Sequence, residues 1–139
     1  MTALVDRGHP RQADPHRYVN AETIPYVVLS PTLTRKGGTR LGDLATVWNR
    51  RNGKLAQAIF ADVGPDDEVG EGSIALARAL GIPDNPRTGG QAGDVAYVVF
   101  PGSGNGRPRA KAEIAATARP LFRDWGGLRR LKRLFPPPP

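Results

Sequence analysis

The chain has 139 residues, which fits one domain and leaves no room for a second folded unit of ordinary size. It contains no cysteine, which excludes disulfides and thiolate metal sites, and its two histidines are too few for a histidine metal centre. The formal net charge of +7 is unevenly spread: residues 128–133 hold four basic residues, whereas residues 57–77 hold five acids and no Lys or Arg. Because a local field steers a charged substrate more than net charge does, we expect one acidic site and no nucleic-acid surface.

The 17 glycines and 14 prolines of the whole chain favour many short elements and turns, and the first half is predicted to contain such elements. Residues 1–17 are polar and are predicted to wrap the surface or fray, with a weak edge-strand signal at Leu4 and Val5. Residues 26–29 are a β-strand, with Pro25 at its start, and residues 30–38 are predicted to be a loop.

Two further strands are predicted over residues 41–49 and 55–61, joined by a hairpin turn at Asn52 and Gly53. This pairing puts Asp62 at the far end of the return strand, near Asp43 at the start of the outgoing one. Asp43 is either a strand-end residue with a structural role or a contact for substrate.

The second half begins with a helix over residues 72–80, with Ser73 as its N-cap and Gly81 just past its end. Residues 94–100 form a buried strand, and residues 110–125 have helical spacing that Pro120 is expected to kink or to split into two short helices. The basic amphipathic segment and four prolines after residue 127 are predicted to be a linker or a loosely docked tail. The resulting division is an N-terminal segment, residues 1–17, a central domain, residues 18–127, and a C-terminal tail, residues 128–139.

The most function-like stretch is residues 58–75, where Asp62 ends a strand and Glu71 opens a helix across a Gly/Pro loop. Hydrolysis of a glycosidic bond needs one carboxyl group as acid and another as base or nucleophile. Apolar neighbours suit Asp62 for the acid, and the helix entrance suits Glu71 for the base. The competing interpretations are an acidic solvated turn with a helix-capping Glu, or Ca²⁺ binding, for which the EF-hand pattern fails.

Six sequence blocks carry a resemblance to a known family. In chain order they are YVNAETIPYVVL, RLGDLA, NRRNGKLAQAIFADVGP, GEGSIALA, VVFPGSG and LFRDWGG. Over residues 18–127 the chain resembles the fungal-type chitosanases of glycoside hydrolase family 75. This resemblance implies that Asp62 and Glu71 are the catalytic pair.

The fold is expected to be mainly β, a β-rich α+β domain. The run DVGPDDEVG is similar to a motif of glycan-cleaving double-psi β-barrels. We therefore expect a small six-stranded double-psi β-barrel-like domain with two flanking helices.

The implied substrate is chitosan, whose β-1,4 bonds between glucosamine units would be cleaved internally with inversion. The ammonium groups of chitosan need acids, and the candidates for binding them are Asp43, Asp66, Asp67 and Glu68. The alternatives are a peptidoglycan-cleaving double-psi-barrel enzyme, a non-catalytic polysaccharide-binding remnant, and a non-enzymatic basic protein that binds an anionic polymer through Arg129, Arg130, Lys132 and Arg133. No cofactor, metal, nucleic acid or membrane partner is expected. The protein is expected to be a monomer. The resemblance implies secretion, although no signal peptide is visible in this chain.

Overall fold

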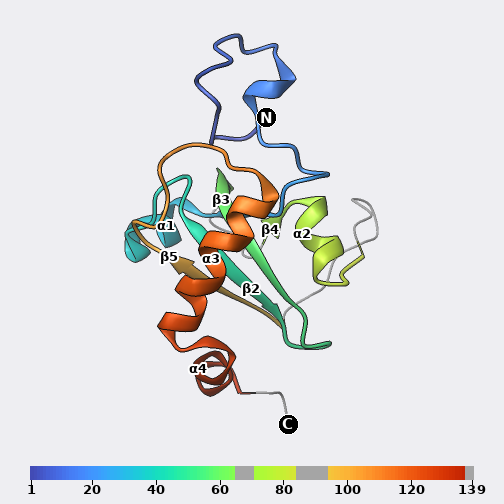
Figure 1. The fold of residues 1–139 in the computed structure, drawn as a ribbon, viewed down its shortest axis with the longest axis vertical. Helices are drawn as coiled ribbons and strands as arrows, with labels where there is room; N and C mark the ends of the chain where they lie inside the picture. The colour runs from blue at the N-terminus through green and yellow to red at the C-terminus, as the bar shows by residue number, and fades with distance from the viewer. Residues whose placement is uncertain (65–70, 84–93, 137–139) are drawn as a thin grey trace.

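A computed structural model of the chain describes residues 1–64, 71–83 and 94–136, and of Glu71 it describes the backbone. The described residues form one sheet with helices on both faces (Figure 1). The strands are β1 (Tyr26–Leu29), β2 (Leu44–Asn49), β3 (Leu55–Val63), β4 (Glu71–Gly72) and β5 (Val95–Phe100). The helices are the 3-10 turn η1 (Pro15–Arg17) and the α-helices α1 (Pro31–Gly37), α2 (Ile74–Ala79), α3 (Lys111–Trp125) and α4 (Gly127–Leu134).

The sheet has the strand order β4-β1-β3-β2-β5. The pair β1 and β3 is parallel, and the other three pairs are antiparallel. Within the described residues β4 and β5 are the two edge strands of the sheet. They do not pair with each other, so this sheet stays open. The expected α+β class is confirmed in part: the described residues form a mixed α+β fold with four α-helices, two more than expected, and a mainly β character is not supported. A sixth strand and a double-psi crossover stay predictions.

Each face of the sheet buries its own apolar cluster, because successive side chains of a strand point to opposite faces. On one face Ile59 and Ala61 of β3 pack with Ile114 and Ala118 of α3. On the other face Ala58 and Phe60 of the same strand pack with Leu76 and Leu80 of the α2 region. The central strand β3 is thus covered on both sides, which fixes the position of its end.

Several local predictions are confirmed. The strand Tyr26–Leu29 forms, and Gly53 turns the β2–β3 hairpin with φ +80°. Ser73 caps α2, since its Oγ accepts a hydrogen bond from the Leu76 N–H at 3.2 Å. Strand β3 runs two residues further than predicted, so Asp62 lies inside it.

The predicted loop over residues 30–38 is wrong, because α1 forms there. The Ser30 Oγ accepts the Leu33 N–H at 3.2 Å, and Pro31 occupies the first turn, where its missing N–H is not needed. Gly38, with φ +67°, ends the helix. These capping residues define the start and the end of a seven-residue helix. The helix has no apolar face from which the sequence could have predicted it.

One of the two expectations for Pro120 is wrong: α3 is not split into two short helices, since one helix runs through the proline, whereas a kink there stays a prediction. The apolar face of α3 packs on the sheet through Ile114, Ala118 and Phe122 on both sides of the proline. This burial outweighs the one backbone hydrogen bond that proline removes.

Both chain ends pack more firmly than predicted. Residues 128–134 are helical in α4, and Leu131 is fully buried in the cluster that α3 covers, so this part of the predicted tail is not loosely docked. Residues 2–19, here called the N-terminal hairpin, bury Leu4 and Val19 in the same cluster. The hairpin and α4 lie at opposite ends of the molecule (Figure 1). In the parts of the chain that the structure covers, no helix is long and apolar enough to span a bilayer.

Candidate functional site

A β-bulge in β3 sets the orientation of Asp62. In the parallel ladder Val27 pairs with Phe60, but the next residue, Val28, pairs with Asp62, so Ala61 is left without a partner. A bulge of this kind turns the residue after it and bends the strand locally. The sequence predicted that Asp62 would end a strand but carried no signal for the bulge.

The carboxylate of Asp62 is only partly buried, and its two oxygens have different surroundings. Oδ1 accepts hydrogen bonds from the Ala3 N–H and from the Val63 N–H, each at 3.0 Å. Among the described residues, no hydrogen bond or ion pair reaches Oδ2. Asp62 therefore has one fixed oxygen and one open oxygen, whereas the sequence predicted an apolar setting for it.

Tyr26 is a neighbour of this carboxylate that sequence reasoning missed. Tyr26 and Val28 alternate onto one face of β1, and the Cα partner of Val28 is Asp62. A diagonal cross-strand position of this kind is within reach of an aromatic side chain. Partial burial, and then the charge of Asp62, raise the pKa of Tyr26 above its usual 10.0. The phenol next to Asp62 therefore stays protonated well into the alkaline range.

The second candidate acid, Glu71, is aligned with Asp62 by the sheet. Val28 is the Cα partner of Asp62 in β3 and also of Glu71 in β4. Positions 62, 28 and 71 therefore stand in one row across three neighbouring strands. Nothing in the spacing of nine residues along the chain predicts this row, because it depends on β1 lying between β3 and β4.

Gly72 is what allows β4 to approach β1. A Cβ at this position would lie 2.5 Å from Leu76 Cδ2 and 2.9 Å from the Tyr26 carbonyl oxygen. Just beyond it, the Ser73 Oγ accepts the Tyr26 N–H at 2.9 Å and donates to the Ile24 carbonyl at 2.8 Å. The Gly-Ser pair of the GEGS block thus anchors position 71 to β1.

Asp43 has a different environment from the other candidates. It is 2 % exposed, and its carboxylate accepts three backbone N–H groups at 2.9 to 3.1 Å, those of Arg40, Gly102 and Gly104. These bonds tie the turn before β2 to the glycine-rich loop after β5. Of the two interpretations drawn from the sequence, this geometry favours the structural one.

The remaining predicted substrate contacts, Asp66, Asp67 and Glu68, lie outside the described residues. The structure therefore brings the backbone positions of Asp62 and Glu71 into one row across the sheet. Asp43, by contrast, is buried and has a structural environment.

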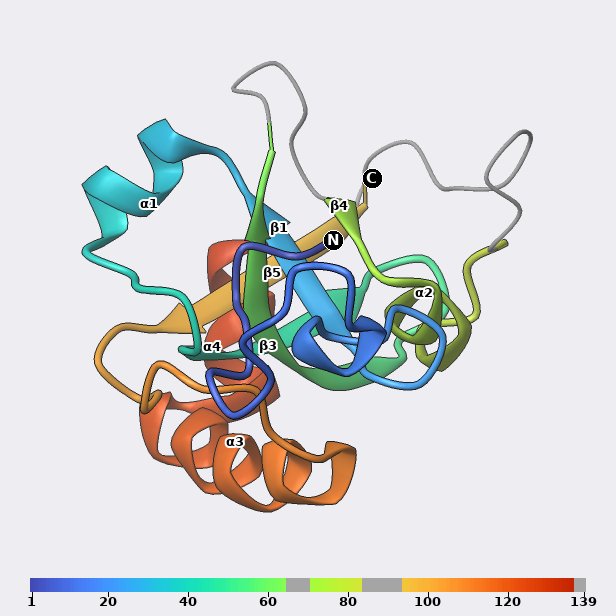
Figure 2. The same ribbon diagram turned by 90° about the horizontal axis from the view of Figure 1, so that it is seen from above.

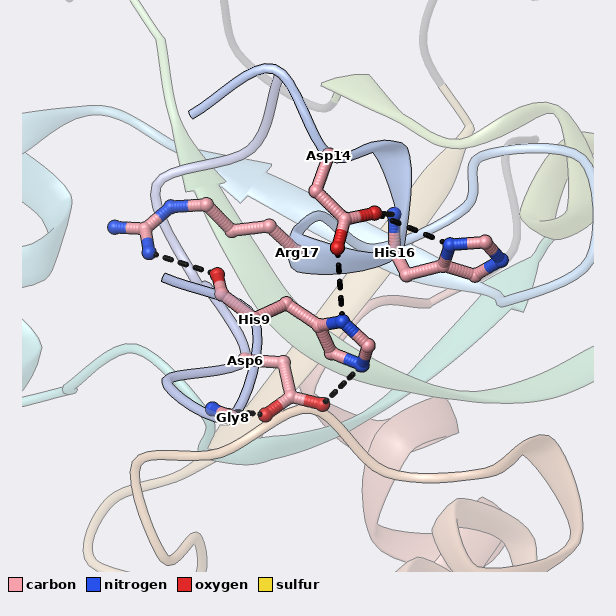
Figure 3. Close-up of polar contacts among 6 residues, drawn as sticks. All are labelled: Asp6, Gly8, His9, Asp14, His16 and Arg17. Carbon is pink, nitrogen blue, oxygen red and sulfur yellow. Dashed lines mark hydrogen bonds and ion pairs between the residues drawn. The ribbon is translucent and has the colours of Figure 1, made fainter. Parts of the chain in front are cut away.

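The two histidines form an ion-pair cluster in the N-terminal hairpin (Figure 3). Asp14 lies between them, with Oδ2 at 2.9 Å from His9 Nδ1 and Oδ1 at 3.1 Å from His16 Nδ1. The pKa of Asp14 is lowered, first by the His16 N–H and also by both imidazoles, against a smaller opposing effect of burial. In the part of the chain that the structure describes, no group of His, Asp and Glu is arranged to hold a metal ion.

A groove of about 460 Å³ lies at the other end of β3 from Asp62. Its walls include Leu55, Gln57 and Phe122, with Lys111 and Arg119 at its border. Two cations in this lining repel an ammonium group, so the groove does not suit a cationic polymer.

Comparison with protein-family models places the chain among the glycoside hydrolases. It belongs to the family described as fungal chitosanase of glycosyl hydrolase group 75, whose model matches residues 11–125. No curated protein matches the chain. The matched range contains Asp43, Asp62 and Glu71, but it starts after Ala3 and ends before α4.

Proposed function

We propose that this protein hydrolyses the β-1,4 bonds between glucosamine units of chitosan, cutting inside the chain, with Asp62 and Glu71 as the catalytic pair. The observation that carries the proposal is the row of positions 62, 28 and 71 across β3, β1 and β4. Family membership supports the reaction class, and the row supports this choice of residues.

In the proposed reaction Asp62 is the general acid and Glu71 is the general base. The proton on Asp62 Oδ2 passes to the glycosidic oxygen as the bond from that oxygen to C1 breaks. Glu71 takes a proton from water, and the water oxygen bonds to C1 from the opposite face. Products are two shorter chains, and the pair returns to its starting state when Glu71 loses its proton and Asp62 regains one.

The spacing of two strands between positions 62 and 71 leaves room for an inverting reaction. Neighbouring strands lie about 4.8 Å apart, so positions 62 and 71 are separated by about 9.6 Å between backbones. Inverting enzymes need about 6.5 to 9.5 Å between carboxyl groups to fit a water, whereas retaining enzymes need about 5 to 5.5 Å. Because the strand β1 lies between the two positions, we propose the wider carboxyl separation of the inverting enzymes.

The charge distribution supports a cationic substrate, and family membership supports a protein that acts outside the cell. Asp66, Asp67 and Glu68 follow Asp62 in sequence and are proposed to bind ammonium groups. The basic helix α4 lies at the far end of the molecule from the hairpin that contacts Asp62, where it does not repel such a chain (Figure 1).

The direct test is incubation of the purified protein with chitosan, chitin and peptidoglycan, with release of reducing ends as the measurement. We expect release from chitosan, loss of that release in Glu71→Gln, and a first product of inverted anomeric configuration by proton NMR. Cleavage of peptidoglycan alone, or a first product of retained configuration, would contradict the proposal.

A further inference from the structure

The N-terminal hairpin reaches the carboxylate to which we assign the proton transfer. The Ala3 N–H donates to Asp62 Oδ1 at 3.0 Å, beside the Val63 N–H on the same oxygen. Seen from above, the hairpin lies across β3 (Figure 2). This contact comes from residues that precede the range matched by the family model.

The bulge in β3 is what receives the hairpin. Ala61 has no partner in the β1–β3 register, and its carbonyl oxygen accepts the Leu4 N–H at 2.9 Å. Leu4 is 3 % exposed and packs in the core, whereas the side chain of Ala3 is exposed. Leu4 therefore anchors the segment, and the Ala3 N–H donates its hydrogen bond to Asp62.

The rest of the hairpin holds Ala3 in place. The Thr2 hydroxyl donates to the Leu4 carbonyl at 2.7 Å and accepts the Val19 N–H at 3.0 Å. Further out, the Asp6 N–H donates to the Arg17 carbonyl at 2.7 Å. The loop beyond is closed by the ion pairs of Asp14 with both histidines (Figure 3).

We propose that the Ala3 backbone N–H is a positioning group for Asp62, which fixes Oδ1 and presents Oδ2 to the glycosidic oxygen. This inference rests on the proposed function, since it assigns work to the proposed acid. Two N–H donors on Oδ1 make that oxygen a pure acceptor, so the transferable proton belongs on Oδ2. Without the Ala3 donor, the carboxyl group can rotate and the proton is less often aimed at the bond.

The test is Ala3→Pro, because proline has no N–H and the Ala3 side chain makes no buried contact. We expect kcat on chitosan to fall roughly tenfold with KM unchanged, as for loss of one charge-assisted hydrogen bond that acts on the reacting group. The variant Ala3→Gly keeps the N–H and restores the kcat that Ala3→Pro loses. A wild-type or higher kcat in Ala3→Pro overturns the proposal.

A second measurement does not depend on activity or on how Ala3→Pro folds. In ¹⁵N-labelled protein the Ala3 amide proton is expected to move upfield in Asp62→Ala, because the hydrogen bond is lost. The control Asp124→Ala removes an exposed acid from α3 and leaves this resonance in place. If the Ala3 amide resonance does not move in Asp62→Ala, the positioning role is overturned. If the wild type does not hydrolyse chitosan, the proposed function is overturned.

Discussion

Asp43 and Asp62 lie close together in the sheet and have opposite surroundings. The Phe60 N–H donates to the Asp43 carbonyl oxygen at 2.8 Å, and Asp62 follows two residues later on β3. Asp43 is 2 % exposed and accepts three backbone N–H groups. Asp62 is half-buried and keeps one oxygen without a partner among the described residues.

The difference between the two acids comes from the backbone around them. Asp43 faces a glycine-rich loop in which Gly104 packs directly on the Gly42 backbone. This close approach lets backbone N–H groups of the loop donate to the carboxylate. Asp62 follows a bulge and meets only the hairpin and its own neighbour. A buried and saturated carboxylate stabilises a fold, and a half-open one is available for chemistry.

The largest effect on stability is expected from Asp43→Ala. It leaves three buried N–H groups without an acceptor, so the free energy of unfolding should fall by about 3 to 5 kcal/mol. Urea unfolding followed by tryptophan fluorescence measures it. A loss of less than about 1 kcal/mol would show that the turn and the loop hold together without Asp43.

A smaller loss is expected from Gly72→Ala, which tests the placement of β4. The added Cβ meets Leu76 and the Tyr26 carbonyl, so β4 must shift away from β1 at a cost of about 1 to 3 kcal/mol. Because position 71 moves with it, chitosan hydrolysis should fall more than stability does. The matched control is Gly37→Ala in α1, where the new Cβ meets only Thr39 Cγ2 at 3.5 Å and stability should hold or rise. Equal behaviour of the two variants contradicts this account of β4.

Tyr26→Phe tests whether the fold raises the pKa of the Tyr26 phenol, first through burial and then through the charge of Asp62. The folded-state pKa of Tyr26 is raised, so the folded chain keeps the phenol proton while the unfolded chain loses it near pH 10. Its contribution to stability is complete below about pH 10 and is lost as pH rises through the folded pKa. Wild type should therefore lose stability between about pH 9 and pH 11 more steeply than Tyr26→Phe in urea unfolding. Parallel curves would show that Tyr26 titrates as it does in water.

The smallest effect is expected from Asp14→Asn in the hairpin. The folded-state pKa of Asp14 is lowered from 3.8, so its contribution is present above about pH 4 and is lost as pH falls through the folded value. At pH 6 the Asp6 amide, which bonds to Arg17, should exchange with solvent faster in the variant than in wild type. The two rates should converge in acid, and a difference that persists there contradicts the ion-pair explanation.

Local signals predicted much of the fold, but of how its parts meet they predicted only the β2–β3 hairpin, which places Asp62 near Asp43. The strand Tyr26–Leu29, the turn at Gly53 and the cap at Ser73 each depend on a few adjacent residues, and the sequence predicted all three. The helix α1 was missed because its signals are caps without an apolar face. Pro120 suggested a break because its local effect is unfavourable, while the packing that compensates comes from the sheet.

The candidate site depends still more on long-range contacts. The parallel pairing of β1 with β3 creates the row that joins positions 62 and 71, and no periodicity in either segment indicates it. The donor to Asp62 comes from Ala3, in a polar segment predicted to fray, because Leu4 is buried in a cluster assembled from distant elements. The residue pattern and the resemblance together selected the two acids, and the sheet brings their backbone positions into one row.

The most direct test of the contrast between the two acids is Asp62→Asn, assayed for both activity and stability. We expect kcat on chitosan to fall by about 10² to 10⁴, the usual loss when a general acid is removed, while the urea midpoint stays near that of the wild type. Asn preserves the shape of the side chain and an oxygen to accept the Ala3 N–H, so the hairpin should stay bound. Hydrolysis of chitosan at the wild-type rate by Asp62→Asn would contradict the assignment of the acid, and with it the division of roles between Asp62 and Asp43.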